Sequence, residues 1–437
     1  MPNTSIIILT YNNLEFTKAC IESIKKYTEP DTYEIIVVDN NSEDDTVSYL
    51  KELKDITLIC NEKNEGFPKG CNIGIAHAQK ENDILLLNND TIVTTNWLKN
   101  LKIALYSSDN VGAVGAISNH QENLQGCDFT YEDFESMQEK AKENNQSNKE
   151  KWEEKVCLIG YCMLIKRTVF NLIGALNEGY SPGYIEDNDL SLNIIEKGYK
   201  LLLCHDAFIH HYLGTEFRQD TEKFNQLILK NRAYFESIWH FNVFTFDETR
   251  NGSIFLAEKP HTILNYQCGI GASSLRIKYL FPKTTILGIE EDKAQKQMAE
   301  HFHPVYSKIE ELPQIFDTIF IGQELERQES PLLFLRNIKK LLKPQGYIIG
   351  ETSNIANIDN LKLLLKDEWY YTNFTKKNHF TKSDLIQIFS ALNFQNIYIY
   401  SYQKELNEEE KSILKALDIE ESNLKNTYYA FRIQLCS

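Results

Sequence analysis

Two clusters of carboxylate and amide side chains hold the residue types best suited to chemistry in this sequence. Asn88–Asp90 follows the apolar run 84–87 directly, and Glu186–Asp189 forms a second acidic cluster further along the chain. Open α/β sheets bind their ligands at the C-terminal ends of the strands. One carboxylate there can hold a divalent cation against a diphosphate, and another can act as a general base. The two clusters therefore predict a site with one metal-binding carboxylate and one base.

Short β-rich runs alternate with amphipathic helical patterns in the first half of the chain, and these elements must position the two clusters. The expected strands are 5–10, 34–39, 57–60 and 84–87, and the expected helices are 15–27 and 46–53. Continuous apolar strands separated by helices are typical of a parallel sheet covered on both faces. The pattern therefore predicts an α/β fold for this half.

The length of 437 residues is too great for one ordinary hydrophobic core. A second alternating series begins near Pro260, and the polar stretch Asp247–Ser253 before it has the composition of a linker. We therefore expect a first domain at 1–245, a linker at 246–259 and a second α/β domain at 260–437.

Composition and charge exclude several classes of protein. The chain is 42% hydrophobic and 25% charged, as soluble globular proteins are, and its net charge of −16 argues against nucleic acid as a partner. No apolar run reaches the ~20 residues of a membrane helix, and Met1–Ser5 lacks the basic region of a signal peptide. The nine cysteines include no Cys-x-x-Cys pair, so we expect reduced thiols in a cytoplasmic protein and no zinc site.

Short motifs follow the expected strands in a fixed order. Thr10-Tyr11-Asn12 ends the first strand, Asp39–Asp44 ends the second, and two Asn-x-Gly elements span Asn64–Gly74. With Asn88–Asp90 and the later block Gly160–Tyr199, this order resembles the family 2 glycosyltransferases of the GT-A fold. It looks most like the non-processive bacterial enzymes that build O-antigen and capsule, and the resemblance covers roughly the first half of the chain.

The resemblance implies that the first two strand ends bind the base of a donor nucleotide. In the family, the turn at Thr10, Tyr11 and Asn12 lies against the base, and an aromatic ring with an amide can stack on and hydrogen-bond a pyrimidine. Asp39 matches the family carboxylate that accepts a bond from the base N3–H. Ordinary strand-ending turns have a similar composition, and this is the alternative for both motifs.

The resemblance also implies contacts to the donor ribose and phosphates. Gly66 allows close approach of the backbone, and Asn72 lies in the segment that opens a helix whose N-terminus faces the donor. Asn88 and Asn89 belong to the family's Asp-x-Asp-like site, where Asn88 replaces an acid and removes one charge. The alternative for the Gly66 segment is a purely structural turn into a helix.

The metal site is implied by two further matches. Asp90 corresponds to the last carboxylate of the Asp-x-Asp site and would bind Mn²⁺ or Mg²⁺, which neutralises the leaving diphosphate. The stretch His210–Gly214 resembles a His-x-x-Gly segment that often supplies another metal contact. The spacing to Gly214 favours His211, with His210 as the alternative, while a structural His pair is the simpler interpretation.

The block Gly160–Tyr199 matches the family's acceptor half almost position by position. By that match Asp187 is the general base, which removes a proton from the acceptor as it attacks the anomeric carbon, and Glu186 orients the acceptor or Asp187. Inverting transfer needs one base and no covalent intermediate. An acidic first turn of a helix explains the same residues, and both interpretations can hold together.

One metal-binding carboxylate and one base suit transfer of a sugar from a nucleotide donor, which we expect to be UDP- or dTDP-linked. A glycan, a lipid-linked oligosaccharide or a peptide is compatible as the acceptor, as are a homodimer and peripheral contact at the inner face of the membrane. The Gln-x-x-Arg-Trp motif of processive synthases does not occur in the sequence. We therefore expect transfer of one or a few sugars.

The segment 119–155 departs from the alternating pattern, because it is rich in Glu, Gln, Asn and Lys and has few apolar anchors. One interpretation is a solvated helical insertion. The other is a mobile lid over the acceptor site, since long insertions in enzymes often gate substrates.

The second half of the chain contains a strand and Gly-bearing turn at Ile263–Gly271, with later strands at 285–290 and 316–321. This series resembles class I S-adenosylmethionine-dependent methyltransferases, which have a Rossmann-like fold. The resemblance implies that Gly269 and Gly271 approach the cofactor. It also implies that Glu290, or its neighbour Glu291, binds the ribose hydroxyls.

Three departures from that family's pattern count against methyl transfer. Asn265 replaces an Asp, Gln267 replaces the first Gly at the close approach to the cofactor, and Arg327 replaces a frequent active-site His. The main prediction is therefore a glycosyltransferase with a methyltransferase-like second domain that has lost part of its motif. The alternatives are a bifunctional enzyme that also methylates, and a non-catalytic glycan-binding or scaffold protein.

Overall fold

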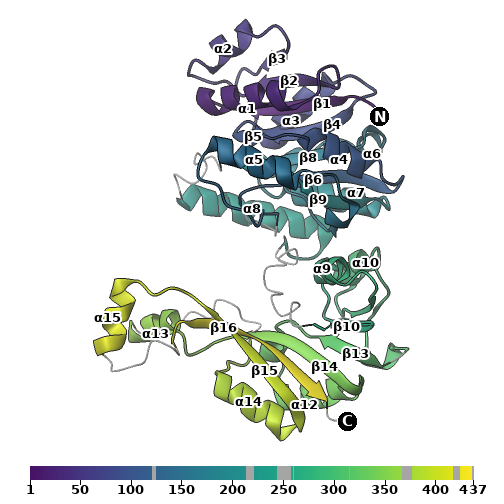
Figure 1. The fold of residues 1–437 in the computed structure, drawn as a ribbon, viewed down its shortest axis with the longest axis vertical. Coiled ribbons are helices and arrows are strands. Elements are labelled where there is room, and N and C mark those ends of the chain that lie inside the picture. The colour runs from purple at the N-terminus through teal and green to yellow at the C-terminus, as the bar shows by residue number, and fades with distance from the viewer. Residues whose placement is uncertain are drawn as a thin grey trace. The chain divides into compact units, whose positions relative to one another are not determined.

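The computed structural model describes residues 1–120, 125–212, 221–243, 257–258, 260–313, 315–366, 376–416 and 424–435. The chain forms two compact units, Met1–Asp247 and Glu248–Ser437, and each is built on a sheet of its own (Figure 1). Most of the expected linker, 246–259, lies outside the described residues.

The first unit contains a nine-stranded sheet with the order β3-β2-β1-β4-β8-β6-β9-β5, and β7 also pairs with β9. Its strands are β1 (Thr4–Thr10), β2 (Tyr33–Asp39), β3 (Thr57–Cys60), β4 (Asp83–Asn88), β5 (Thr91–Val93), β6 (Val111–Ile117), β7 (Trp152–Lys155), β8 (Cys162–Ile165) and β9 (Lys200–His211). The four predicted strands are confirmed as β1 to β4 and are mutually parallel. The sheet as a whole is mixed, because β8, β5 and β7 run antiparallel to their partners.

Helices cover both faces of this sheet, which explains why its strands are apolar at successive positions. The helices of the first unit are α1 (Leu14–Tyr27), α2 (Thr46–Glu52), α3 (Phe67–Ala76), α4 (Trp97–Leu105), α5 (Phe134–Asn144), α6 (Arg167–Ile173), α7 (Glu186–Glu196) and α8 (Thr221–Trp239). Ile6 and Ile8 pack in one core with residues of α1, α2 and α4. The opposite face packs against α3, where Gly70 and Gly74 let the helix approach Leu9 and Ile7 closely.

The polar segment 119–155 is fastened to the sheet along its later part. The predicted helix is confirmed as α5, which begins at the Asp133 capping box. Asn145 is fully buried, and its side chain donates to Thr94 and accepts the N–H of Phe208. Strand β7 was not predicted, because its sequence Trp-Glu-Glu-Lys has no apolar run. Its inward-facing Glu153 instead bonds to His205 on β9 at 2.9 Å. The lid function stays a prediction.

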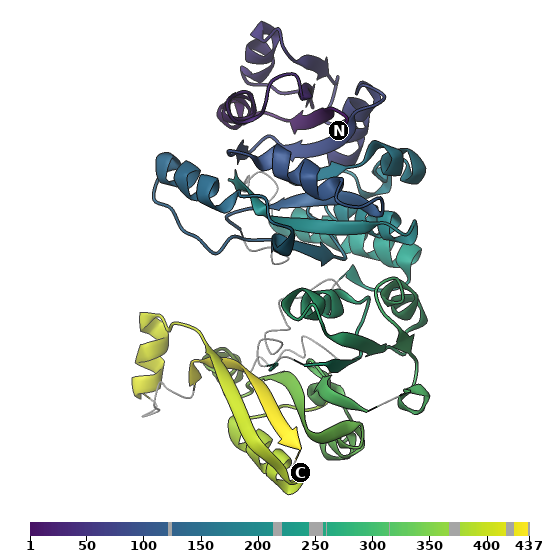
Figure 2. The same cartoon turned by 45° about the vertical axis from the view of Figure 1, so that its right-hand side comes forward.

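The second unit contains a seven-stranded sheet with the order β12-β11-β10-β13-β14-β16-β15. Its strands are β10 (Thr262–Tyr266), β11 (Thr285–Ile289), β12 (Val305–Tyr306), β13 (Phe316–Phe320), β14 (Leu342–Ser353), β15 (Phe394–Gln403) and β16 (Asn426–Leu435). β16 runs antiparallel to both of its neighbours, β14 and the edge strand β15, while the other described pairs are parallel (Figure 2). The strand expected within Ile263–Gly271 and the strands predicted at 285–290 and 316–321 are confirmed as β10, β11 and β13. The antiparallel β15–β16 pair was not predicted.

Helices of the second unit also pack on both faces of its sheet. They are α9 (Ala272–Leu280), α10 (Lys293–Ala299), α11 (Glu324–Arg327), α12 (Pro331–Lys339), α13 (Ile358–Leu365), α14 (Lys382–Ala391) and α15 (Glu408–Ala416). The larger core joins β10, β13 and β16 to α12 and α14, and a smaller core joins the other face to α9. This is a Rossmann-like arrangement.

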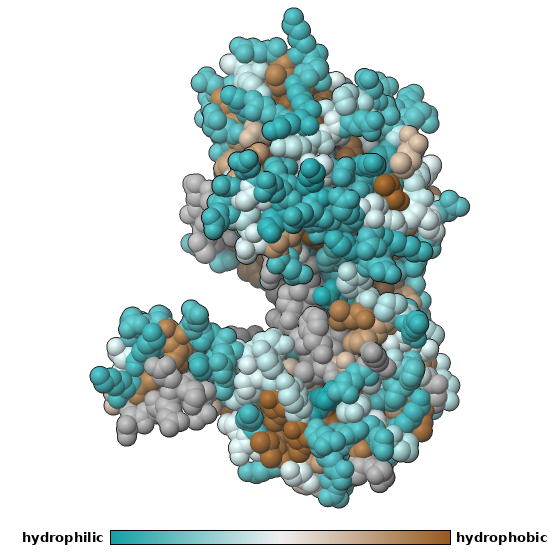
Figure 3. All heavy atoms as spheres, viewed as in Figure 1, coloured by the Kyte–Doolittle hydropathy of each residue, from teal (hydrophilic) through white to brown (hydrophobic). Residues whose placement is uncertain are grey.

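The surface agrees with the acidic composition, since the face drawn in Figure 3 is mainly hydrophilic, with scattered apolar patches. Among the helices that the structure describes, none is both long and apolar enough to cross a membrane.

Candidate active site

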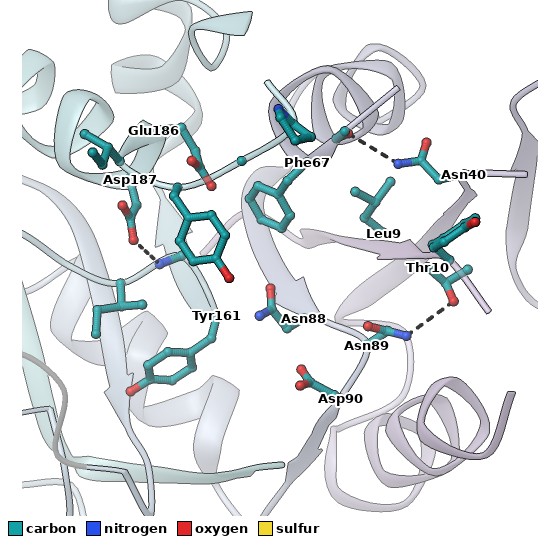
Figure 4. A pocket seen from close by; sticks show the side chains of 18 of the residues that line it. Leu9, Thr10, Asn40, Phe67, Asn88, Asn89, Asp90, Tyr161, Glu186 and Asp187 are labelled. Atoms are coloured by element: carbon teal, nitrogen blue, oxygen red, sulfur yellow. Dashed lines mark hydrogen bonds between the residues drawn. The ribbon is translucent and has the colours of Figure 1, made fainter. Parts of the chain in front are cut away.

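A cavity of about 840 Å³ lies at the C-terminal ends of β1, β2 and β4 (Figure 4). Its first wall comes from the ends of these strands and the start of α3, and its second wall comes from the loops before β8 and α7, the end of β9, and α8. Residues that line it include Thr10, Tyr11, Asn40, Gly66, Phe67, Asn88, Asn89, Asp90, Gly160, Tyr161, Tyr184, Glu186, Asp187, His211, Ile228 and Arg232. The two clusters singled out in the sequence therefore open into one cavity.

Parallel pairing explains why the predicted strand ends meet here. Thr10 lies opposite Asp39 in the register of β1 and β2, and Leu9 lies opposite Asn88 in the register of β1 and β4. All three strands therefore end at nearly the same level of the sheet. The side chains that follow them face a common space, as expected for a parallel sheet.

Strand β5 brings Asp90 to His211. Directly after Asp90 the chain forms β5, which pairs antiparallel with the end of β9 so that Thr91 lies opposite His211. Asp90 Oδ1 then lies 3.1 Å from His211 Nε2, and each residue is 7% exposed. The ring of Tyr161 stacks on the His211 ring at a centroid distance of 5.1 Å.

The structure distinguishes the two histidines that the sequence left open. His210 points to the hydroxyl of Tyr131, and burial lowers the pKa of His210 to about 4. His211 lines the cavity beside Asp90. His211 is therefore the better candidate for a metal contact. Gly214, which completes the sequence motif, lies outside the described residues.

Asp90 and His211 offer a carboxylate oxygen and an imidazole nitrogen, both of which bind Mn²⁺. Among the described residues no group of three or more His, Cys, Asp or Glu side chains is placed to hold a metal ion. A cation at this pair would thus need other oxygen ligands, and a diphosphate supplies such oxygens. The residues fit a metal shared with a substrate.

Asn88 ends β4 and Asn89 follows it, and both line the cavity (Figure 4). The Asn89 amide donates to the hydroxyls of Thr17 at 3.0 Å and Thr10 at 3.3 Å, which holds the turn against β1 and α1. Tyr11 lines the cavity with 36% of its surface exposed, so its ring is accessible to a ligand.

Asp39, which was predicted to contact the donor base, is 1% exposed and is absent from the described residues that line the cavity. One of its carboxylate oxygens is satisfied and the other is not. Its Oδ2 accepts the N–H of Ser42 at 3.0 Å, whereas its buried Oδ1 has no hydrogen-bond donor among the described residues. An unsatisfied buried acceptor is costly in a folded protein unless a ligand completes it. Asn12 has a different role, because its side chain accepts the N–H of Glu43 and joins the turns after β1 and β2.

The segment that opens α3 contributes Gly66 and Phe67 to the cavity. The Phe67 N–H donates to the carbonyl of Pro182 at 2.7 Å, which ties this segment to the loop before α7. Asn72, which was predicted to contact the donor, is absent from the described residues that line the cavity. Its amide exchanges two hydrogen bonds of 2.9 Å with the backbone of Leu176, so its contribution is to hold α3 against that segment.

Glu186 and Asp187 lie in the first turn of α7. Asp187 accepts backbone N–H bonds from Gly160 at 3.2 Å and from Asn188 at 2.9 Å (Figure 4). Glu186 is 7% exposed, and its Oε2 has no hydrogen-bond partner among the described residues. Burial and the neighbouring Asp187 raise the pKa of Glu186 to about 8. The first turn thus pairs a carboxyl group held by backbone N–H donors with a buried carboxyl group whose pKa is raised.

Helix α8 adds cavity residues that the sequence analysis missed. Ile228 and Arg232 line the cavity, and Arg232 is the one Lys or Arg among the described lining residues. Burial lowers the pKa of the Arg232 guanidinium. No motif marked this helix, because its contribution depends on where it packs after β9.

Comparison with known protein families identifies the kind of domain that contains this cavity. Residues 5–174 match the family model for glycosyl transferase family 2, and residues 246–399 match a model for a methyltransferase domain. The first unit carries a glycosyltransferase family 2 domain. The cavity of this glycosyltransferase domain lies partly within the matched residues, and α7, the end of β9 and α8 follow them along the chain.

Similar curated proteins each align with part of this chain. The O-antigen chain rhamnosyltransferase RfbN of Salmonella typhimurium is 25% identical over 234 residues, which are 50% of this chain and 69% of that protein. An uncharacterized protein of Sinorhizobium fredii, y4gI, is 25% identical over 265 residues, or 54% of this chain, and the chain spans only 28% of its length. A tRNA U34 carboxymethyltransferase of Pseudoalteromonas atlantica is 28% identical over 127 residues, or 27% of this chain and 39% of that protein.

Replacement of Gly66 by alanine tests the contact between the α3 segment and the loop before α7. Gly66 has φ +81°, and an added Cβ would lie 2.7 Å from Pro182 Cα. Gly174 has a similar φ of +88° with nothing within 4 Å of its Cβ position, so it is a matched control. We expect Gly174→Ala to lower the free energy of unfolding by about 1–2 kcal/mol and Gly66→Ala to lower it further. Equal losses in urea unfolding would show that the contact is unimportant.

The raised pKa of Glu186 predicts a pH dependence of stability. Because the folded protein holds this proton more tightly than the unfolded chain, the stabilisation is complete below the unfolded value of 4.5 and is lost as pH rises toward about 8. Glu186→Gln should therefore gain stability relative to the wild type between pH 5 and pH 8, by up to about 1.4 kcal/mol per pH unit. The measurement is urea unfolding at both pH values, with the exposed Glu143→Gln as control. Identical pH dependence in wild type and Glu186→Gln would contradict the assignment.

Proposed function

We propose that the first unit is an inverting, metal-dependent, non-processive glycosyltransferase that moves a sugar from a UDP- or dTDP-linked donor to a glycan, lipid-linked or peptide acceptor. The observation that carries this proposal is that the Asp90–His211 pair and Asp187 open into one cavity of a glycosyltransferase family 2 domain. The Asp90–His211 pair can then act on the leaving group, and Asp187 can act on the nucleophile, within the same cavity. The rhamnosyltransferase similarity supports a deoxysugar nucleotide as the first donor to test.

The donor base would bind at the ends of β1 and β2. The buried Oδ1 of Asp39 fits an N–H donor such as pyrimidine N3–H, which both uracil and thymine carry. Tyr11 is exposed enough for its ring to stack on the base. A cytosine base lacks that N–H and would leave Asp39 unsatisfied, which favours UDP or dTDP over CDP.

Asp90 and His211 would hold Mn²⁺ or Mg²⁺ at the diphosphate end of the donor. The bound cation would supply positive charge that stabilises the diphosphate as a leaving group. Arg232 adds a second positive charge to the cavity wall. Asn88, at the position where many family members have an acid, contributes an amide that can donate to a ribose or phosphate oxygen.

Asp187 would act as the general base. Its carboxylate takes the proton from the acceptor hydroxyl, the hydroxyl oxygen forms a bond to the anomeric carbon, and the bond from that carbon to the diphosphate oxygen breaks with inversion. Glu186, whose pKa is raised by burial and by Asp187, can in its protonated form donate a hydrogen bond to another acceptor oxygen. The two adjacent carboxyl groups thereby divide deprotonation and orientation between them.

Paired substitutions test this function. Asp187→Asn should lower the rate of transfer by about 100- to 10,000-fold, because the base is lost, and should leave donor binding intact. Asp90→Ala should abolish the metal dependence of donor binding. The measurements are calorimetry with UDP- and dTDP-sugars with and without Mn²⁺, and turnover with candidate acceptors. Asp109→Asn, an exposed acid, is the control. Full turnover by Asp187→Asn would remove it as the base, and unchanged metal dependence in Asp90→Ala would remove the metal site.

A second candidate function is S-adenosylmethionine binding, with methyl transfer to the sugar or its acceptor, by the second unit. The supporting observation is the contact between the Gly-bearing turn and Glu290, whose Oε2 accepts the Gly269 N–H at 2.8 Å and whose Oε1 accepts the Asp292 N–H at 2.9 Å. Each oxygen keeps a second lone pair that fits a ribose hydroxyl. Gly269 and Gly271 have φ of +57° and +93° at the start of α9.

The departures seen in the sequence have structural counterparts. Asn265 is buried and donates to the hydroxyls of Ser273 and Ser274 at 2.8 Å, so it ties β10 to α9 without a charge. Gln267 adopts φ +53°, where glycine is the usual residue.

Calorimetry with S-adenosylmethionine tests the second candidate function. We expect binding that weakens at least about tenfold in Glu290→Ala, by loss of a charged hydrogen bond, and that persists in Glu291→Ala, since Glu291 is exposed. No binding by the wild-type chain would exclude the cofactor. Equal weakening in both variants would argue against a specific role for Glu290.

A further inference from the structure

Helix α8 holds the loop that leads into α7. Near its end, Trp239 donates to Asp189 at 2.9 Å, and Tyr234 lies 3.3 Å from the side-chain oxygen of Asn177. Near its start, the ring of Phe224 contacts the ring of Tyr184 at a centroid distance of 5.1 Å. The helix therefore spans the whole loop on which Glu186 and Asp187 depend.

Asn231, in the middle of α8, makes the most concentrated of these contacts. The residue is fully buried. Its amide nitrogen lies 2.9 Å from the carbonyl of Tyr180, 2.8 Å from that of Gly183 and 3.1 Å from that of Tyr184. Three carbonyl oxygens around one NH₂ group require the nitrogen on that side, because the amide oxygen would be repelled there.

The side-chain oxygen of Asn231 is further evidence that the hydrogen bonds of its NH₂ group matter. Asn231 Oδ1 is buried and has no hydrogen-bond donor among the described residues. A buried polar group with an unsatisfied atom destabilises a folded protein, and an apolar residue would avoid this. The hydrogen bonds from the NH₂ group to the loop carbonyls therefore explain why an asparagine stands at position 231.

The loop has a backbone conformation that needs external support. Tyr184 has φ +74° and Ile185 has φ +78°, and neither is glycine. Left-handed conformations are unfavourable for such residues, above all for a β-branched one, and persist only when surrounding contacts impose them. Ile185 is the N-cap residue of α7, and its carbonyl accepts the Asp189 N–H. These two residues therefore set the direction in which Glu186 and Asp187 leave the loop.

We propose that Asn231 is a positioning residue for the acceptor half of the active site. By holding the carbonyls of Gly183 and Tyr184, it maintains the left-handed turn that aims Asp187 and Glu186 into the cavity. This role rests on the proposed glycosyltransferase function. Asn231 itself touches no substrate, and its side chain contacts none of the proposed donor or metal residues in the interactions described above, so its effect falls on transfer and on the acceptor.

Two variants of Asn231 test the proposal. Asn231→Ala removes the donors, and Asn231→Asp keeps the shape of the side chain but turns an oxygen toward the three carbonyls. We expect both to lower kcat by about 100-fold, the loss typical of misplacing a catalytic group by about 1 Å. The donor Kd, measured by calorimetry with Mn²⁺, should change less than threefold. Asn225→Asp, on an exposed position of the same helix, is the control for added charge.

A separate measurement follows the loop itself. Backbone amide hydrogen exchange at Tyr184–Asn188 should accelerate in Asn231→Ala at a temperature where the wild type and the variant are both folded. If Asn231→Asp does not fold, the exchange rate in Asn231→Ala still tests the positioning role.

The possible results distinguish a failure of the positioning role of Asn231 from a failure of the proposed glycosyltransferase function. A wild-type chain that binds no nucleotide sugar and transfers none would overturn the proposed function and the positioning role together. Transfer by the wild type with equal kcat in Asn231→Ala would overturn the positioning role alone. A parallel loss of donor affinity and melting temperature in Asn231→Ala, without faster exchange in the loop, would show a general structural role and would also overturn it.

Discussion

The arrangement of this active site depends on the pairing of β5 with the end of β9. The three residues of β5 follow Asp90 directly, and their pairing with β9 places Thr91 opposite His211. Without that pairing, Asp90 and His211 would be two isolated polar groups at distant points of the sequence. With it, a carboxylate and an imidazole lie 3.1 Å apart, buried at one end of the cavity. The two side chains that the proposed cation site needs are brought together by this contact.

The acceptor side of the cavity is built in a different way. The donor side lies at the ends of parallel strands, whose alignment is set by backbone pairing. The proposed acceptor side combines the loops before β8 and α7 with the first turn of α7 and with α8, and such loops need side chains to hold them. Pro182 contacts the α3 segment, and Asn231 holds the carbonyls that lead into α7. The carboxyl pair Glu186 and Asp187 therefore depends on contacts between elements far apart in the sequence.

The two units differ in how many of the polar groups at their expected sites already have hydrogen-bond partners. In the first unit, the cavity is lined by Glu186, whose Oε2 has no hydrogen-bond partner among the described residues, and by the closely spaced Asp90–His211 pair. In the second unit, the polar groups of the expected cofactor site are largely bonded to one another, as Asn265 is to two serines and Glu290 to two backbone N–H groups. These internal contacts are compatible with a scaffold as well as with a cofactor site, since each Glu290 oxygen keeps a second lone pair.

The sequence by itself determined the α/β class, the strands β1 to β4 and the position of the polar residues at their ends, because apolar runs and strand-ending turns are local signals. It also determined the Glu186–Asp187 pair, through its likeness to a family. Only the tertiary structure placed His211 rather than His210 in the cavity beside Asp90, left Asn12, Asp39 and Asn72 out of the described lining, revealed β7, and showed Arg232 and Asn231 on α8. Each of these depends on side chains meeting across the fold, and a contact between residues more than forty positions apart leaves no periodic trace in one sequence.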